Sequence, residues 1–119
     1  MILGENENPN IWKKNIYDSL KNLSDIELQK LTWLGKHPKY ISSFTEIISV
    51  LYDDFDFERY IQYYESKYGM DDLYKSFCEL NNSINSYQEL ESDELILKDP
   101  NWIKITKKAK EIVQSIKAT

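Results

Sequence analysis

The residues of this chain that most resemble a chemical site are acidic side chains at the spacing of a calcium-binding loop. Four of them match positions 1, 3, 5 and 12 of such a loop: Asp54, Asp56, Glu58 and Glu65. The sixth position of the loop makes a sharp turn that usually demands glycine, and this chain has Arg59 there. Because apolar residues run through the segment at helical spacing, the sequence predicts a helix and no metal site.

Other residue types that support catalysis or cofactor binding are few and scattered. His37, the only histidine, precedes Pro38, so a Ser-His-Asp or Cys-His relay would have to rest on one residue in a predicted loop. Cys78, the only cysteine, falls beside the apolar face of a predicted helix, as a small core or boundary residue does. The three glycines are too far apart for a phosphate-binding loop. We therefore expect a binding protein and not an enzyme, with no catalytic residue, no cofactor and no small-molecule substrate.

Aromatic and acidic residues alternate densely between positions 46 and 74. Residues 46–99 contain fourteen acids and four bases, a net charge of −10, whereas residues 1–45 and 100–119 have net charges of +1 and +4. An acidic field attracts basic partners and repels phosphate backbones. Solvation of helix faces also explains such charges, but the tyrosines among them favour a surface that binds a basic protein and not nucleic acid.

Six residues of this stretch form the predicted partner-binding face, at the junction of the third and fourth predicted helices: Asp53, Asp54, Asp56, Glu58, Tyr63 and Glu65. Glu58 and Glu65 fall in a polar row away from the apolar stripe of the fourth helix, and Tyr63 flanks that row. Nine tyrosines exceed what a core of this size can satisfy at every hydroxyl, so several are expected at the surface. There, a tyrosine such as Tyr63 can anchor a partner.

The elements that position this face are predicted to be helices throughout. Apolar residues recur at spacings of three and four, and the chain has only three Gly and three Pro. The predicted fold class is all-α, a single-domain bundle of five or six helices. It covers residues 11–119 and follows a flexible N-terminus of residues 1–10.

Capping signals set the expected ends of the first three helices. Asn10 is predicted to cap a helix over residues 11–22. A capping box that starts at Ser24 predicts a second helix to Leu34, and another that starts at Ser43 predicts a third to about residue 53.

Asp56 is predicted to cap a fourth helix that ends at Gly69. Its expected buried stripe comprises Phe57, Tyr60, Ile61, Tyr64 and Tyr68.

The last part of the chain is predicted to hold two longer helices. One begins at Asp71 or Asp72 and frays near Leu90. The other is predicted to have Asp99 as its N-cap and Pro100 at its first position, and it runs to about residue 117. Residues 95–97 are expected to form a turn or a single helical turn. Three indoles in a small chain are most simply core residues: Trp12, Trp33 and Trp102.

The sequence also bears on the compartment. A single cysteine cannot form an intramolecular disulfide, which suits a reducing environment. The N-terminus has no signal-peptide pattern, and no apolar run approaches the roughly 20 residues that a membrane span requires. We expect a cytoplasmic protein that does not contact the membrane.

Three segments resemble a known family: residues 23–35 (LSDIELQKLTWLG), 41–46 (ISSFTE) and 51–57 (LYDDFDF). In these phrases the chain is similar, over about residues 11–115, to small bacterial immunity proteins of polymorphic toxin and contact-dependent growth-inhibition systems. The resemblance implies a cytoplasmic, toxin-antitoxin type of inhibitor that binds and neutralises one cognate toxin domain, often a nuclease. It assigns no role to any single residue. A basic nuclease cleft and an acidic, tyrosine-bearing surface complement each other in charge.

A second interpretation belongs to another functional class. The final helix carries four closely spaced lysines: Lys104, Lys107, Lys108 and Lys110. A basic helix of this kind can meet an acidic partner or nucleic acid, which would make the chain a non-enzymatic adaptor or regulatory subunit. The same lysines also suit a solvated helix face.

Overall fold

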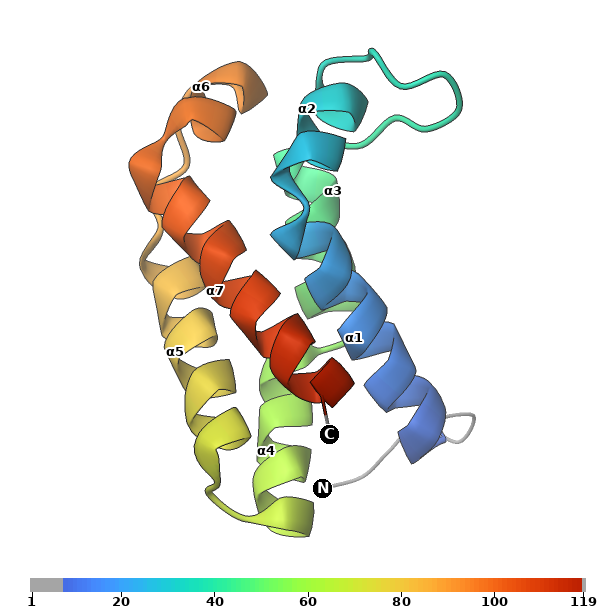
Figure 1. Cartoon of the computed structure of the whole chain (residues 1–119), viewed down its shortest axis with the longest axis vertical. Coiled ribbons are helices and arrows are strands. Elements are labelled where there is room, and N and C mark those ends of the chain that lie inside the picture. The colour runs from blue at the N-terminus through green and yellow to red at the C-terminus, as the bar shows by residue number, and fades with distance from the viewer. Residues whose placement is uncertain (1–7, 119) are drawn as a thin grey trace.

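Helices make up nearly all of the regular structure of this chain (Figure 1). The computed structural model describes residues 8–118, which contain seven α-helices, one π-helical segment and no strand. The elements are α1 (Pro9–Ser24), α2 (Ile26–Trp33), α3 (Phe44–Ser49), η1 (Val50–Asp54), α4 (Phe57–Tyr68), α5 (Asp72–Ser86), α6 (Asp93–Lys98) and α7 (Pro100–Ala118). The all-α prediction is confirmed. The predicted count of five or six helices is slightly below the seven α-helices of the described residues, because the turn or single helical turn expected at residues 95–97 forms the six-residue helix α6.

The C-terminal helix α7 organises the bundle. It lies between α1 and α5 in Figure 1, and it packs against both helices. Helix α4 forms an antiparallel hairpin with α5, and α2 packs against α6 at the other end of the molecule. The buried apolar residues form one continuous cluster: Trp12, Ile16, Leu20, Leu23, Trp33, Phe44, Leu51, Phe57, Tyr60, Ile61, Tyr64, Phe77, Leu80, Ile96, Leu97, Trp102, Ile105, Ala109 and Ile112. All three tryptophans are therefore core residues, as predicted.

One buried amide joins three of these helices. Gln29 of α2 is only 1% exposed. Its Nε2 donates to the carbonyl oxygens of Asn22 and Leu23, at 2.9 and 3.0 Å, in the last turn of α1. Its Oε1 accepts a hydrogen bond from Nε1 of Trp102 on α7, at 3.0 Å. The carbonyls at a helix end have no partner within the helix, so Gln29 satisfies the end of α1 while it fixes α7.

The first helix starts earlier than predicted. Asn8, and not Asn10, caps α1, because the Asn8 side chain accepts a hydrogen bond from the backbone N–H of Asn10 at 2.8 Å. Pro9 occupies the first helical position, where its missing N–H costs nothing. Residues 8–10 are thus part of the helical domain, and the rest of the expected flexible N-terminus lies outside the described residues.

The expected capping box at Ser24 is wrong by one residue. Asp25 caps α2 by accepting the backbone N–H of Leu28 at 3.0 Å, whereas the Ser24 hydroxyl donates to the carbonyl of Lys21 at 2.7 Å. Ser24 is the last residue of α1, so its hydroxyl bonds to a carbonyl of that helix and does not cap the next one.

Three other predicted caps are confirmed. Ser43, Asp71 and Asp99 cap α3, α5 and α7, and each side-chain oxygen accepts a backbone N–H within 3.0 Å. Gly35 and Gly69 follow α2 and α4 with φ of +72° and +84°, a region that side chains with a Cβ rarely adopt. Helix α5 ends at Ser86, four residues before the predicted end near Leu90.

We predict that Gln29→Met lowers the free energy of unfolding by on the order of 3 kcal/mol, measured by urea denaturation. Methionine preserves the length and volume of the side chain but removes the three hydrogen bonds of the amide. It leaves the buried N–H of Trp102 without its acceptor, and an unsatisfied buried polar group costs about 1–3 kcal/mol.

A tryptophan pair separates the hydrogen-bond loss from the packing loss. The buried Nε1 of Trp33 has no hydrogen-bond partner among the described residues, whereas Nε1 of Trp102 donates to Gln29. Trp33→Phe and Trp102→Phe remove similar volumes, so the second should destabilise the fold more. Equal losses from the two variants would contradict the role assigned to Gln29.

Candidate functional site

Three carboxylates lie at the end of η1 and in the turn that joins it to α4. Asp53, Asp54 and Asp56 are all exposed. Between them, the carbonyl of Phe55 accepts a hydrogen bond of 2.7 Å from Nε1 of Trp12, which is a buried residue of α1. We call residues 53–56 the acidic corner. The bond to Trp12 fixes its backbone to the core while its carboxylates face solvent.

Asp56 has an uncommon backbone conformation in this corner. Its φ of 49° and ψ of 63° are left-handed, and among the described residues it is the only one other than glycine with a positive φ. The predicted cap of α4 by the Asp56 side chain is wrong, because no capping hydrogen bond forms. A capping side chain normally leaves from extended backbone, which Asp56 does not have. Its carboxylate lies instead 3.9 Å from the guanidinium of Arg59, as an exposed pair.

Glu58 is held in place by the neighbouring helix. Its Oε2 accepts hydrogen bonds from the side-chain amides of Asn81 and Asn85 on α5, at 3.2 and 3.1 Å. Asn81 in turn accepts a 2.8 Å hydrogen bond from the hydroxyl of Tyr52. The carboxylate is exposed but has a defined position, set by groups on η1 and α5. The calcium-loop alternative fails here, because Glu58 and Glu65 both lie on helix α4.

Glu65 and Asp71 accept hydrogen bonds from tyrosines. The Tyr74 hydroxyl donates to Glu65 at 2.7 Å, and the Tyr64 hydroxyl donates to Asp71 at 2.8 Å. The alternation of tyrosines and acids is therefore partly an internal arrangement, which satisfies hydroxyl groups that the core leaves at its edge. The interpretation of this pattern as a recognition surface alone is corrected accordingly.

The predicted face is not continuous, because Tyr63 lies on the opposite flank of α4 from Glu58 and Glu65. The Tyr63 ring is half-buried and packs 5.4 Å from the Trp12 ring on α1. The two glutamates contact α5. Tyr63 thus belongs to the contact between α4 and α1, which the sequence could not reveal because helical spacing alone does not say what packs beside an intermediate position.

The buried stripe of α4 ends one turn earlier than predicted. Phe57, Tyr60, Ile61 and Tyr64 are buried, but Tyr68 is 51% exposed. Its ring remains 4.8 Å from the ring of Tyr64. Together with Tyr40, it is one of the tyrosines at the surface.

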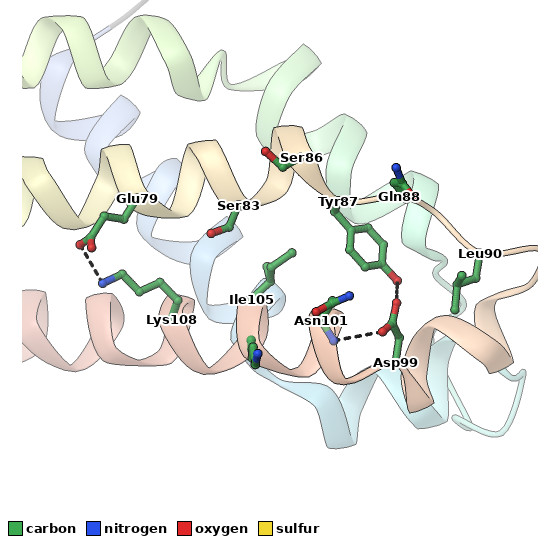
Figure 2. Close-up of a pocket in the computed structure, with 11 residues that line it drawn as sticks. Glu79, Ser83, Ser86, Tyr87, Gln88, Leu90, Asp99, Asn101, Ile105 and Lys108 are labelled. Atoms are coloured by element: carbon green, nitrogen blue, oxygen red, sulfur yellow. Dashed lines mark hydrogen bonds and ion pairs between the residues drawn. The ribbon is translucent and has the colours of Figure 1, made fainter.

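A hollow between α5 and α7 is lined by residues of both helices and of the segment that follows α5 (Figure 2). Lys108 pairs with Glu79 at 3.0 Å across it, and the Tyr87 hydroxyl donates to Asp99 at 2.8 Å. Asp99 also caps α7. These acids have internal partners, and Lys108 is one of the four lysines of the proposed basic helix. Its charge is balanced by α5, while Lys104, Lys107 and Lys110 are exposed.

The residues first considered for catalysis have structural contacts. Nδ1 of His37 accepts the backbone N–H groups of Lys39 and Tyr40, both at 3.0 Å, and so shapes the loop between α2 and α3. Cys78 is half-buried on α5 and packs against the core cluster.

Comparisons with protein-family models, curated proteins and solved structures find no match to this chain. Within residues 8–118, no helix combines the length and apolar character needed to cross a membrane.

We predict that Tyr63→Ala lowers the free energy of unfolding by about 2 kcal/mol, since it removes a half-buried ring from the contact with Trp12. Thermal or urea denaturation measures the change. Tyr40→Ala is the matched control, because Tyr40 is 64% exposed and its loss should change stability little. If Tyr63→Ala leaves the free energy of unfolding unchanged, Tyr63 would instead be a surface residue that is free to anchor a partner.

We also predict that the protein loses stability in alkali. Burial, and then the hydrogen bond to Asp71, raise the pKa of Tyr64 from 10.0 to about 12. Burial also raises the pKa of Tyr52, Tyr60 and Tyr87, and the bond to Glu65 raises that of Tyr74.

A raised folded-state pKa contributes stability that is complete below the unfolded pKa and is lost as the pH rises toward the folded value. The free energy of unfolding should therefore fall above about pH 10, the unfolded tyrosine pKa. Urea denaturation at a series of pH values on both sides of this pKa measures the free energy of unfolding, and tyrosinate absorbance recorded in parallel reports the ionisation. A flat profile would show that these hydroxyls are not protected in the folded state.

Proposed function

We propose that this chain is an immunity protein that binds and neutralises a cognate toxin domain, most simply a basic nuclease, in the bacterial cytoplasm. The acidic corner is the centre of the binding surface, and Glu58 and Glu65 extend it along the α5 flank of α4. The observation that carries the proposal is the combination of exposed carboxylates with a fixed backbone at residues 53–56. The resemblance of residues 23–35, 41–46 and 51–57 to immunity proteins supports the same function.

Charge distribution is the first support. Residues 46–99 have a net charge of −10, from fourteen acids and four bases. Of the three carboxylates of the acidic corner, that of Asp56 lies 3.9 Å from the guanidinium of Arg59, and about half of each of these two side chains is exposed. An exposed pair of this length contributes little, so the corner keeps a strong negative field. Such a field speeds association with a basic partner.

Rigidity is the second support. Hydrogen bonds from Asn81 and Asn85 hold one oxygen of Glu58, and a hydrogen bond from Tyr74 holds one oxygen of Glu65. A partner that pairs with these carboxylates therefore has less side-chain freedom to restrict, which favours affinity. Seven residues along a helix separate the two by about 10 Å.

The mechanism of inhibition follows from charge. A nuclease must hold a polyanion, so its cleft presents Lys and Arg side chains that position phosphates. Carboxylates fixed on a helical surface compete for the same side chains and exclude the nucleic acid. This inhibition needs no catalytic group on the inhibitor.

The deciding experiment starts from the gene immediately upstream of the gene for this chain, which the proposal expects to encode the toxin domain. Expression of the toxin domain alone should arrest growth, and co-expression of this chain should restore it through a stable complex. Failure of rescue, together with absence of a complex between the purified proteins, would overturn the proposal.

We predict that Asp53→Asn, Asp54→Asn and Asp56→Asn combined slow association with that toxin domain by about tenfold and flatten its salt dependence. Stopped-flow or surface-binding kinetics at several ionic strengths measure both. The matched control neutralises three exposed acids on other helices, Glu27, Glu94 and Glu111, with the same change in net charge. Equal slowing by the two triple variants would show that only net charge matters and that the corner is not the site.

A further inference from the structure

A hollow with several aromatic residues in its lining lies at the end of the bundle opposite α2 and α6. The α4–α5 turn, the start of α1 and the end of α7 meet at this end (Figure 1). Its volume is about 410 Å³. Its lining includes the rings of Tyr17, Tyr64, Tyr68 and Phe77 and the charged side chains of Lys13, Asp71 and Asp72. We call it the tyrosine hollow.

The rings that line the tyrosine hollow are placed to receive a cation. Tyr64 and Tyr68 lie 4.8 Å apart with their planes tilted by 43°, and half of the Tyr68 surface is exposed. Tyr64 also packs against Phe77, with 5.4 Å between the ring centroids, and this contact fixes the floor of the hollow. Tyr17, by contrast, already lies under the ammonium group of Lys21, at 5.7 Å. The faces of aromatic rings attract cations, and arginine is the side chain that most often uses them.

Two carboxylates stand at the edge of the same hollow. The backbone N–H of Tyr74, and then the Tyr64 hydroxyl, hold the pKa of Asp71 below its usual value, so Asp71 is ionised at neutral pH. Asp72 is exposed in the first turn of α5. Lys13 also lines the hollow, and among the described residues it forms no ion pair with either acid. Because both oxygens of Asp71 accept hydrogen bonds from Tyr64 and Tyr74, Asp72 is the acid of this pair that is open to a ligand.

We propose that the tyrosine hollow receives an arginine side chain of the basic partner protein, stacked on Tyr68 and paired with Asp72. This rests on the proposed function for the identity of the partner. Arginine fits better than lysine, because its planar, weakly hydrated guanidinium both stacks on a ring and pairs with a carboxylate. Tyr68 and the acidic corner lie at opposite ends of α4, about 18 Å apart at 1.5 Å per residue. The partner would thus be held at both ends of one helix.

The test needs no partner protein. The ¹⁵N-labelled full chain is titrated with Nα-acetyl-arginine amide and, as the neutral analogue of nearly equal shape, Nα-acetyl-citrulline amide. We expect the arginine probe to shift the backbone resonances of Tyr68, Asp72 and Phe77, and the citrulline probe to leave them unchanged. Nα-acetyl-lysine amide should bind more weakly than the arginine probe.

Variants then assign the binding to the hollow. Tyr68→Ala should weaken the affinity for the arginine probe by about fivefold, because one cation–π contact is lost. Tyr68→Phe keeps an aromatic ring and should change this affinity less than twofold. Asp72→Asn should also weaken binding, and Lys13→Ala should tighten it. The combined Asp53, Asp54 and Asp56 to Asn variant should leave the shifts at the hollow unchanged.

Two results would overturn this inference: equal shifts with arginine and citrulline, or arginine shifts that Tyr68→Ala does not reduce. Either result leaves the acidic corner and its growth-rescue test untouched. Conversely, failure of growth rescue with intact arginine binding would reject the proposed function and leave the hollow as a site for guanidinium groups.

Discussion

The hydrogen bonds of the Gln29 amide hold together the helices on which the rest of this structure depends. Helix α7 contacts α1, α5 and α6, and its Trp102 is completely buried among aromatic rings. The indole N–H of Trp102 needs an acceptor in that environment, and the end of α1 needs donors. Gln29 supplies both. Because a buried amide is favourable only when its groups are satisfied, it selects one arrangement of α1, α2 and α7.

A second set of polar contacts positions the acidic side of the molecule relative to this core. Tyrosines at the edge of the core donate to carboxylates of neighbouring segments, as Tyr74 does to Glu65 on α4 and Tyr64 to Asp71, the N-cap of α5. Each contact lets an aromatic ring contribute apolar area while its hydroxyl is satisfied. It also fixes the position of an acid without removing its charge. The same residues therefore contribute to stability and to the electrostatic field that the proposed function uses.

In both proposed binding regions, groups in the core position charged side chains at the surface. The acidic corner has a backbone tied to α1 by Trp12, and the tyrosine hollow has a floor of packed rings on α4 and α5. In both, the charged groups are at the surface and the groups that position them are in the core. A basic partner would meet carboxylates whose geometry is set before binding, so that charge affects the rate of encounter and ring contacts affect dissociation.

The sequence by itself determined the helical class, the core tryptophans and several helix ends, because periodicity and caps such as Ser43, Asp71 and Asp99 act within a few residues. It also located the acidic stretch, since charge needs no fold to be counted. Only the tertiary structure decided what each side chain of that stretch contacts. Glu58 meets α5 and Tyr63 meets α1, from positions on one helix that look equally free in the sequence. Those partners lie far away along the chain, and contacts of that range depend on how the helices pack.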